Sequence, residues 1–270
     1  MQPTEKPRPL THFTEEDRNE PEGIFWDPDP NAFPHLIPLN QQHGSPVTIV
    51  IPGINGTQAV WSGLASAVPG PVYHLDWDNQ LDFPDPDIRD VSLSSFLRLG
   101  AWVLEYTDLN LKAWEAGRQL GFQLSGNRPV QFNLVGHSMG TVVIAGFLST
   151  VGYCRIQSVH LVNGAVSGTA PVLDWTYHRN RLGVPVTNWY NPADPVLMPL
   201  KLAHQILNFT SGVALRSVPL ATRFSTLSDL LNPCGLGAFP AFDENRDVES
   251  IQGESHDPQR VLEELAKGLG

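Results

Sequence analysis

From residue 46 onward, short apolar runs alternate with longer stretches in which apolar residues recur every three or four positions. The run VTIVI at 47–51 is continuous and β-branched, which is typical of a strand buried on both faces of a sheet. The stretch 92–124 has the spacing of one or two amphipathic helices. By the same criteria we predict further strands at 71–77, 130–136, 156–164, 184–192 and 248–255, and further helices at 57–68, 139–152 and 257–269.

This alternation of strands and helices predicts the fold class. Strands that are separated by helices form a mostly parallel sheet with helices on both faces, so we expect an α/β protein. In such sheets the active site lies beyond the carboxyl ends of the strands. The pattern therefore places Gly53, Ser138, residues 191–194 and His256 at one edge of the sheet, where the chemistry is expected.

Residues 1–45 differ from the rest of the chain because they are rich in proline and charge, as in TEKPRP and DPDPNAFPHLIP. Proline removes a hydrogen-bond donor and favours extended geometry in the residue before it, so no helix is expected here. We predict an extended N-terminal arm over 1–45 and an α/β domain over 46–270. Within the domain, residues 197–245 form either a cap or lid over the active-site edge or an additional helix on the scaffold.

Charge and composition exclude several classes of function. The formal net charge is −11 and the pI is about 5.2, so the chain repels nucleic-acid phosphates, and nucleic-acid binding is not expected. No apolar run is long enough for a transmembrane helix, and the first residues lack the apolar core of a signal peptide, which favours a cytoplasmic location. The two cysteines, Cys154 and Cys234, indicate free thiols and no disulfide framework.

Ser138 lies between two glycines in LVGHSMGTVV, residues 134–143, after an apolar run and before an apolar helical pattern. A serine on a sharp strand-to-helix turn is presented as a nucleophile, and Gly136 and Gly140 prevent collisions across that turn. The turn also leaves the backbone N–H of Met139 at a helix N-terminus, where it can stabilise developing negative charge. The segment therefore indicates a catalytic serine.

The segment GHSMG after FNLV resembles the nucleophile elbow of the α/β-hydrolase superfamily, which includes lipase-like and esterase-like serine hydrolases. The order of IPGING, the elbow, NPADPV and GESHDP along the chain is similar to that family's arrangement over residues 46–270. This resemblance implies the α/β-hydrolase fold, a catalytic triad and an oxyanion hole. It identifies no subfamily.

The oxyanion hole implied by the resemblance consists of two backbone N–H groups. One belongs to Met139, and the other comes from the loop after the first strand of the domain. In that loop Gly53 permits close approach of the backbone, and the N–H of Ile54 is the donor we favour. Asn55 is the alternative donor, through its backbone or its side-chain amide. The family often has His-Gly where this chain has Pro52-Gly53.

The remaining members of the triad are expected in the order acid and then base. Asp194 follows a predicted strand between two prolines, where a rigid carboxylate can orient an imidazole and stabilise its cation. Asp174, after the preceding strand, is the alternative acid. His256 follows the last predicted strand and precedes the final helix, which is the position of the family's general base. His137, inside the elbow, is expected to have a packing role.

We therefore predict a serine hydrolase that cleaves a carboxylic ester through an acyl-enzyme, with a small acyl compound as its substrate. The same residues would serve a thioesterase, an amidase or an acyltransferase. A non-catalytic α/β-hydrolase scaffold that binds a small ligand is the alternative of a different class. The sequence contains no metal-binding or nucleotide-binding motif, so neither a cofactor nor a metal site is expected.

Overall fold

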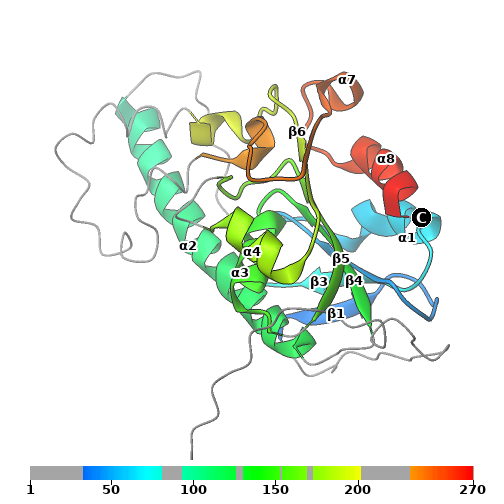
Figure 1. The fold of residues 1–270 in the computed structure, drawn as a ribbon. Helices are drawn as coiled ribbons and strands as arrows, with labels where there is room; N and C mark the ends of the chain where they lie inside the picture. The colour runs from blue at the N-terminus through cyan, green and yellow to red at the C-terminus, as the bar shows by residue number, and fades with distance from the viewer. Residues whose placement is uncertain are drawn as a thin grey trace, which may run out of the picture.

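The computed structural model describes residues 33–80, 93–125, 130–152, 154–168, 173–201 and 232–269. Their strands form one seven-stranded sheet in the order β1-β3-β2-β4-β5-β6-β7 (Figure 1). All neighbouring strands are parallel except β1, which pairs antiparallel with β3. The strands are β1 (His35–Pro38), β2 (Val47–Ile51), β3 (Val72–Asp76), β4 (Gln131–His137), β5 (Arg155–Val162), β6 (Val186–Tyr190) and β7 (Glu244–Asp247).

Helices cover both faces of this sheet (Figure 1). One face packs against α2 (Leu93–Leu124), α3 (Gly140–Thr150) and α4 (Trp175–Leu182). The other face packs against α1 (Ser62–Ala67) and α8 (Gln259–Leu269). The predicted fold class, a mostly parallel sheet with helices on both faces, is confirmed.

The hydrophobic core consists of two layers, one on each side of the sheet, and β2 contributes to both. Ile49 and Ile51 point into the layer beneath α2 and α3, whereas Val50 points into the layer beneath α1 and α8. All five residues of β2 are buried for this reason. The continuous apolar run in the sequence is therefore the direct result of a strand that is covered on both faces.

Three elements differ from the predicted ones. The segment 248–255 is not a strand: β7 lies just before it, and Glu249–Gln252 form the short helix α7. The side chains of β7 are mostly exposed, so this edge strand pairs with β6 through its backbone and has no apolar pattern. Helix α4 was not predicted, because only Trp175 among its residues is buried and no apolar spacing marks it.

The boundary between arm and domain also requires correction. Residues His35–Pro38, within the predicted arm, form strand β1 at the edge of the sheet, so the domain begins before residue 46. The first 32 residues of the predicted arm lie outside the described residues. Within the predicted cap at 197–245, residues 202–231 also lie outside them, whereas residues 232–245 pack into the domain and end in β7.

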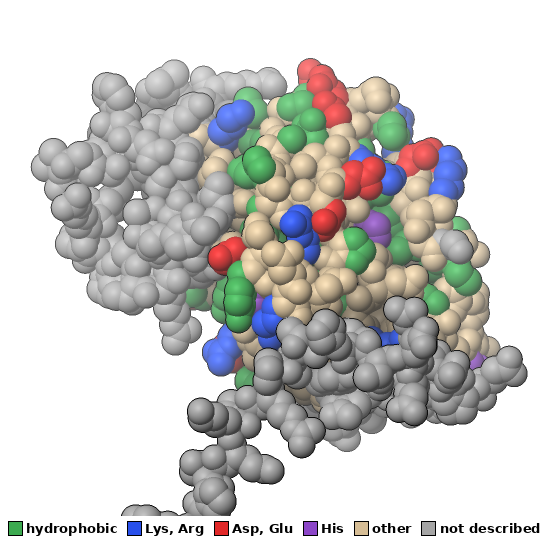
Figure 2. Space-filling view, viewed as in Figure 1, with side chains coloured by type: hydrophobic (Ala, Val, Ile, Leu, Met, Phe, Trp, Pro, Cys, Tyr) green, Lys and Arg blue, Asp and Glu red, His purple; other side chains and the backbone are tan. Residues whose placement is uncertain are grey.

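On the face drawn in Figure 2, acidic and basic side chains are interspersed over the described surface. Helix α2 has 32 residues, but no helix in the described ranges is both long and apolar enough to cross a bilayer. Among the same residues, no group of three or more histidine, cysteine, aspartate or glutamate side chains could hold a metal ion.

Candidate active site

Ser138 occupies a tight turn between the end of β4 and the start of α3. Its backbone has φ of 52°, in the left-handed region that residues with a side chain rarely adopt. A methyl group on Gly140 would lie 2.2 Å from the carbonyl oxygen of Ile51, and one on Gly136 would lie 2.7 Å from Ile144 Cδ1. Gly140 is therefore required for the turn to pack against β2, and a methyl group on Gly136 would require the Ile144 side chain to shift.

Hydrogen bonds hold this turn in place. The Ser138 N–H donates to the Val162 carbonyl at 3.0 Å, and the Thr141 hydroxyl donates to the Ser138 carbonyl at 2.6 Å. Ser138 and His256 both lie in the described part of the chain, and no hydrogen bond joins their side chains. Catalytic hydrogen bonds often tighten only when substrate binds.

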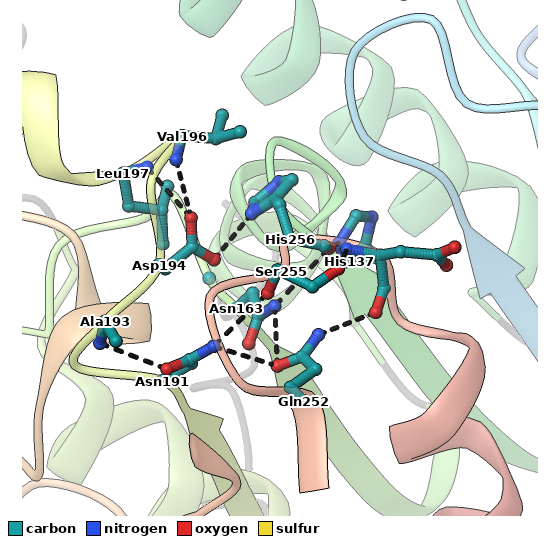
Figure 3. Close-up of polar contacts among 12 residues, drawn as sticks. His137, Asn163, Asn191, Ala193, Asp194, Val196, Leu197, Gln252, Ser255 and His256 are labelled. Atoms are coloured by element: carbon teal, nitrogen blue, oxygen red, sulfur yellow. Dashed lines mark hydrogen bonds and ion pairs between the residues drawn. The ribbon is translucent and has the colours of Figure 1, made fainter.

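Asp194 and His256 form the closest ionisable pair at this edge of the sheet (Figure 3). Asp194 Oδ2 lies 2.6 Å from His256 Nδ1. The other carboxylate oxygen accepts the backbone N–H groups of Val196 at 2.9 Å and Leu197 at 3.0 Å. Asp194 is fully buried, so these three donors replace the water that a carboxylate otherwise requires. With Nδ1–H directed at the carboxylate, Nε2 is the ring nitrogen that can exchange a proton with a reacting group.

Asp174, the alternative acid, has a different contact. It precedes α4, and its carboxylate accepts the backbone N–H of Tyr177 at 2.9 Å. This is the interaction of a helix N-cap. Of the two predicted acids, the structure thus brings Asp194 to His256 and uses Asp174 to begin a helix.

The loop after β2 lies directly beside Ser138. A methyl group on Gly53 would be 2.6 Å from Ser138 Cβ and 3.2 Å from Ser138 Oγ, so only glycine permits this approach. The Asn55 backbone N–H donates to the Asn79 carbonyl at 3.0 Å and is therefore occupied. Within the described part of the chain, the N–H groups of Ile54 and Met139 donate no hydrogen bond, and they remain the predicted pair of donors.

Two polar side chains that the sequence analysis did not identify hold this loop from the end of β3. The Asn79 side-chain amide donates to the carbonyls of Gly53 at 2.8 Å and Gly56 at 3.2 Å. The Trp77 indole N–H donates to the Pro52 carbonyl at 3.1 Å. Their position at the carboxyl end of the predicted strand 71–77 was the only signal in the sequence.

His137 was expected to have a packing role, but it makes a specific contact with the histidine beside it. Its Nε2 lies 2.8 Å from the backbone carbonyl of His256, and the two rings lie 4.7 Å apart. Burial, and then the proximity of His256, lower the pKa of His137 well below its usual value. His137 is therefore neutral at pH 7 and donates its Nε2–H to the carbonyl.

The sheet topology, the tight turn that presents Ser138, and the order Ser138, Asp194, His256 along the chain are those of the α/β-hydrolase fold.

Comparisons with known proteins find similar chains among solved structures, at low sequence identity. No protein-family model and no curated protein sequence matches the chain. Among solved structures, the protein TT1662 from Thermus thermophilus is 16% identical over 84% of this chain and 88% of its own, with a TM-score of 0.47. A carboxylesterase from Mesorhizobium loti is 14% identical over 83% of this chain and 90% of its own, with a TM-score of 0.36.

Proposed function

We propose that the protein is a serine hydrolase that cleaves a carboxylic ester through an acyl-enzyme intermediate, without a cofactor. The observation that carries the proposal is the buried Asp194 carboxylate 2.6 Å from His256 Nδ1, at the same edge of the sheet as the turn that presents Ser138. A carboxylate so placed fixes the imidazole tautomer and stabilises the imidazolium that forms during acyl transfer.

In the first step, Ser138 Oγ attacks the acyl carbon of the ester while His256 Nε2 takes the hydroxyl proton. The electron pair of the C=O bond moves to the carbonyl oxygen, which becomes an oxyanion. When the tetrahedral intermediate collapses, the bond to the alcohol oxygen breaks and His256 gives its proton to the leaving alcohol. The product of this step is an ester between Ser138 and the acyl group.

In the second step, a water molecule replaces the alcohol. His256 takes a proton from the water as it attacks the acyl carbon, and it returns that proton to Ser138 Oγ when the acid leaves. In both steps the N–H groups of Met139 and Ile54 would stabilise the oxyanion. Met139 is suited to this because it precedes an 11-residue helix, whose N-terminus favours negative charge.

Matched acyl substrates test both the chemistry and the bond that is cleaved. We would compare a p-nitrophenyl ester, a thioester and an anilide of the same short acyl group, using wild type, Ser138→Ala and Ser149→Ala. Ser149 lies on α3, where its hydroxyl bonds only to Gly146 and Thr150 among the described residues, so its replacement controls for the loss of a serine hydroxyl nearby.

We expect the ester to be cleaved fastest, and Ser138→Ala to lower kcat by about 10⁴-fold or more. Ser149→Ala should retain wild-type turnover. Faster cleavage of the thioester or the anilide would assign the same residues to a thioesterase or an amidase. If folded wild type turned over none of the three, a ligand-binding scaffold would be the better reading of the site.

A further inference from the structure

His256 lies on a short irregular loop, residues 253–257, between α7 and α8, which we call the histidine loop (Figure 3). Backbone carbonyls in a loop have no ladder or helix partner, so they accept from water or from donors elsewhere in the protein. In this loop those donors are side chains. Their arrangement determines where the His256 ring can lie.

Four side chains donate to the histidine loop (Figure 3). The Asn191 amide donates to the carbonyls of Gly253 at 2.8 Å and Ser255 at 3.2 Å. Two further carbonyls of the loop, those of His256 and Asp257, also accept side-chain donors. His256 accepts from His137 Nε2 at 2.8 Å and Asn163 Nδ2 at 3.4 Å, and Asp257 accepts from Gln252 Nε2 at 2.7 Å.

The three amides are also connected to one another. Gln252 Oε1 accepts from Asn163 Nδ2 at 3.1 Å and from Asn191 Nδ2 at 3.4 Å. Asn163 and Asn191 are fully buried and Gln252 is 3% exposed, so none of them can contact a substrate. Buried polar groups are costly when they lose a partner, so the hydrogen bonds of this network favour the observed position of the loop. We call His137, Asn163, Asn191 and Gln252 the loop bracket.

The loop bracket connects the histidine loop to the elements that carry the other two candidate catalytic groups. His137 is the last residue of β4 and directly precedes Ser138. Asn191 follows β6, and its carbonyl accepts the backbone N–H of Asp194 at 3.1 Å. The bracket therefore fixes His256 relative to both the serine and the acid.

We propose that the loop bracket is a positioning unit, which holds His256 at the place where it can serve both Ser138 and Asp194. The proposal rests on the proposed function. Its residues act through His256 and contact no reacting atom. A displacement of a catalytic group by about 1 Å can lower the rate about 100-fold, so a loosened bracket should affect turnover and leave substrate binding intact.

Gln252→Met tests this directly, because methionine fills a similar volume and can neither donate to Asp257 nor accept from the two asparagines. We expect kcat for a p-nitrophenyl ester to fall by about 10- to 100-fold with KM within about twofold of wild type. In proton NMR spectra, the downfield signal of His256 Nδ1–H, which reports its bond to Asp194, should broaden or disappear.

Val47→Ala is the matched control, because Val47 is buried at the opposite end of the sheet, at the start of β2. It should lower stability while leaving kcat and the downfield signal as in wild type. His137→Phe is a second test that keeps a ring at a half-buried position and removes the donor to the His256 carbonyl. It should reproduce the effect of Gln252→Met on kcat.

The two proposals fail in different ways. If both bracket variants fold and keep wild-type kcat and the wild-type signal of Nδ1–H, the positioning role is wrong while ester turnover by wild type still stands. If Gln252→Met does not fold, the kcat and the Nδ1–H signal of His137→Phe decide whether the positioning role holds. Absence of ester turnover by wild type would instead overturn the proposed function.

Discussion

Both carboxylate oxygens of Asp194 are hydrogen-bonded, Oδ1 to the backbone N–H groups of Val196 and Leu197 and Oδ2 to His256. Asp194→Asn should keep the shape of the site and place an amide N–H where His256 Nδ1–H now points. The imidazole would then carry its proton on Nε2 and could not accept one from Ser138.

For Asp194→Asn we expect kcat for an ester to fall by about 10⁴-fold with little change in the thermal midpoint. Asp174→Asn is the matched control, because asparagine is as good a helix N-cap as aspartate. Steady-state kinetics and a thermal melt of both variants check this. A large loss of activity in Asp174→Asn with a small one in Asp194→Asn would show that the acid is misassigned.

Gly140 gives a residue-scale prediction about stability. Its added methyl group would lie 2.2 Å from a backbone oxygen of β2, which cannot move aside as a flexible side chain could. Gly140→Ala should therefore lower the free energy of unfolding by about 3 kcal/mol. Gly63→Ala, in helix α1 with no atom within 4 Å of the new methyl group, should raise it by about 0.5 to 1 kcal/mol. Urea denaturation measures both, and equal effects would contradict the packing argument.

The site residues that could be identified from the sequence lie in recognisable local patterns, whereas those that could not are far apart along the chain. Ser138 and its two flanking glycines are recognisable from their spacing in the sequence. His256 is recognisable from its place before the final helix. Asn163, Asn191 and Gln252 lie up to 89 positions apart and meet only in the fold. Asn163 and Asn191 directly follow strands β5 and β6, so the sequence predicts their place at the carboxyl edge of the sheet. It does not predict that Gln252 is their partner.

Among the structural elements, the loop of residues 52–56 is held by contacts from outside itself. Asn79 donates to two of its carbonyls and accepts the Asn55 N–H with its own backbone oxygen. Asn79→Ala should let the loop move, so that the Ile54 N–H no longer points at the developing oxyanion.

The expected result for Asn79→Ala is a fall in kcat of about 10- to 100-fold, less than the loss of an oxyanion donor itself, with KM nearly unchanged. Gln80→Ala is the control, because Gln80 is exposed and its side chain hydrogen-bonds only to the Asn79 side-chain oxygen among the described residues. Stopped-flow or steady-state assays would compare the two. Wild-type kcat in a folded Asn79→Ala protein would refute a role for this contact.

Elements were predictable wherever burial gave them an apolar pattern. Strands β2, β4, β5 and β6 and helices α2, α3 and α8 follow from the sequence for that reason. Edge strand β7 does not follow from the sequence, because it is held by backbone pairing. The polar helix α4 does not either, because it is held by its Asp174 N-cap and by Gly183, which has a left-handed backbone conformation at the C-terminus of the helix.

At the scale of the whole molecule, buried histidines link stability to pH. Burial lowers the pKa of His74 and of His137, and burial with the nearby Arg246 lowers the pKa of His160 to about 4. The unfolded chain binds protons at these histidines near pH 6.5, before the folded protein does. Their contribution to stability is therefore complete above pH 6.5 and is lost as the pH falls toward 4.

Urea unfolding between pH 4 and 8 should show this loss, with a slope of up to about 1.4 kcal/mol per pH unit for each histidine. His74 has no hydrogen-bond partner at either ring nitrogen among the described residues and is 4% exposed. His74→Leu should therefore be more stable than wild type below pH 6 and less sensitive to pH. His35→Gln, at an exposed position of β1, should behave as wild type. An unchanged slope in His74→Leu would contradict the assignment.

The central claim is that Ser138 is an activated nucleophile, and covalent labelling tests it most directly. We would measure the intact mass of wild type and Ser138→Ala after exposure to a fluorophosphonate probe. We expect one probe per wild-type chain and none on Ser138→Ala. A folded wild type that takes up no probe, or a Ser138→Ala variant labelled at the same rate, would contradict it.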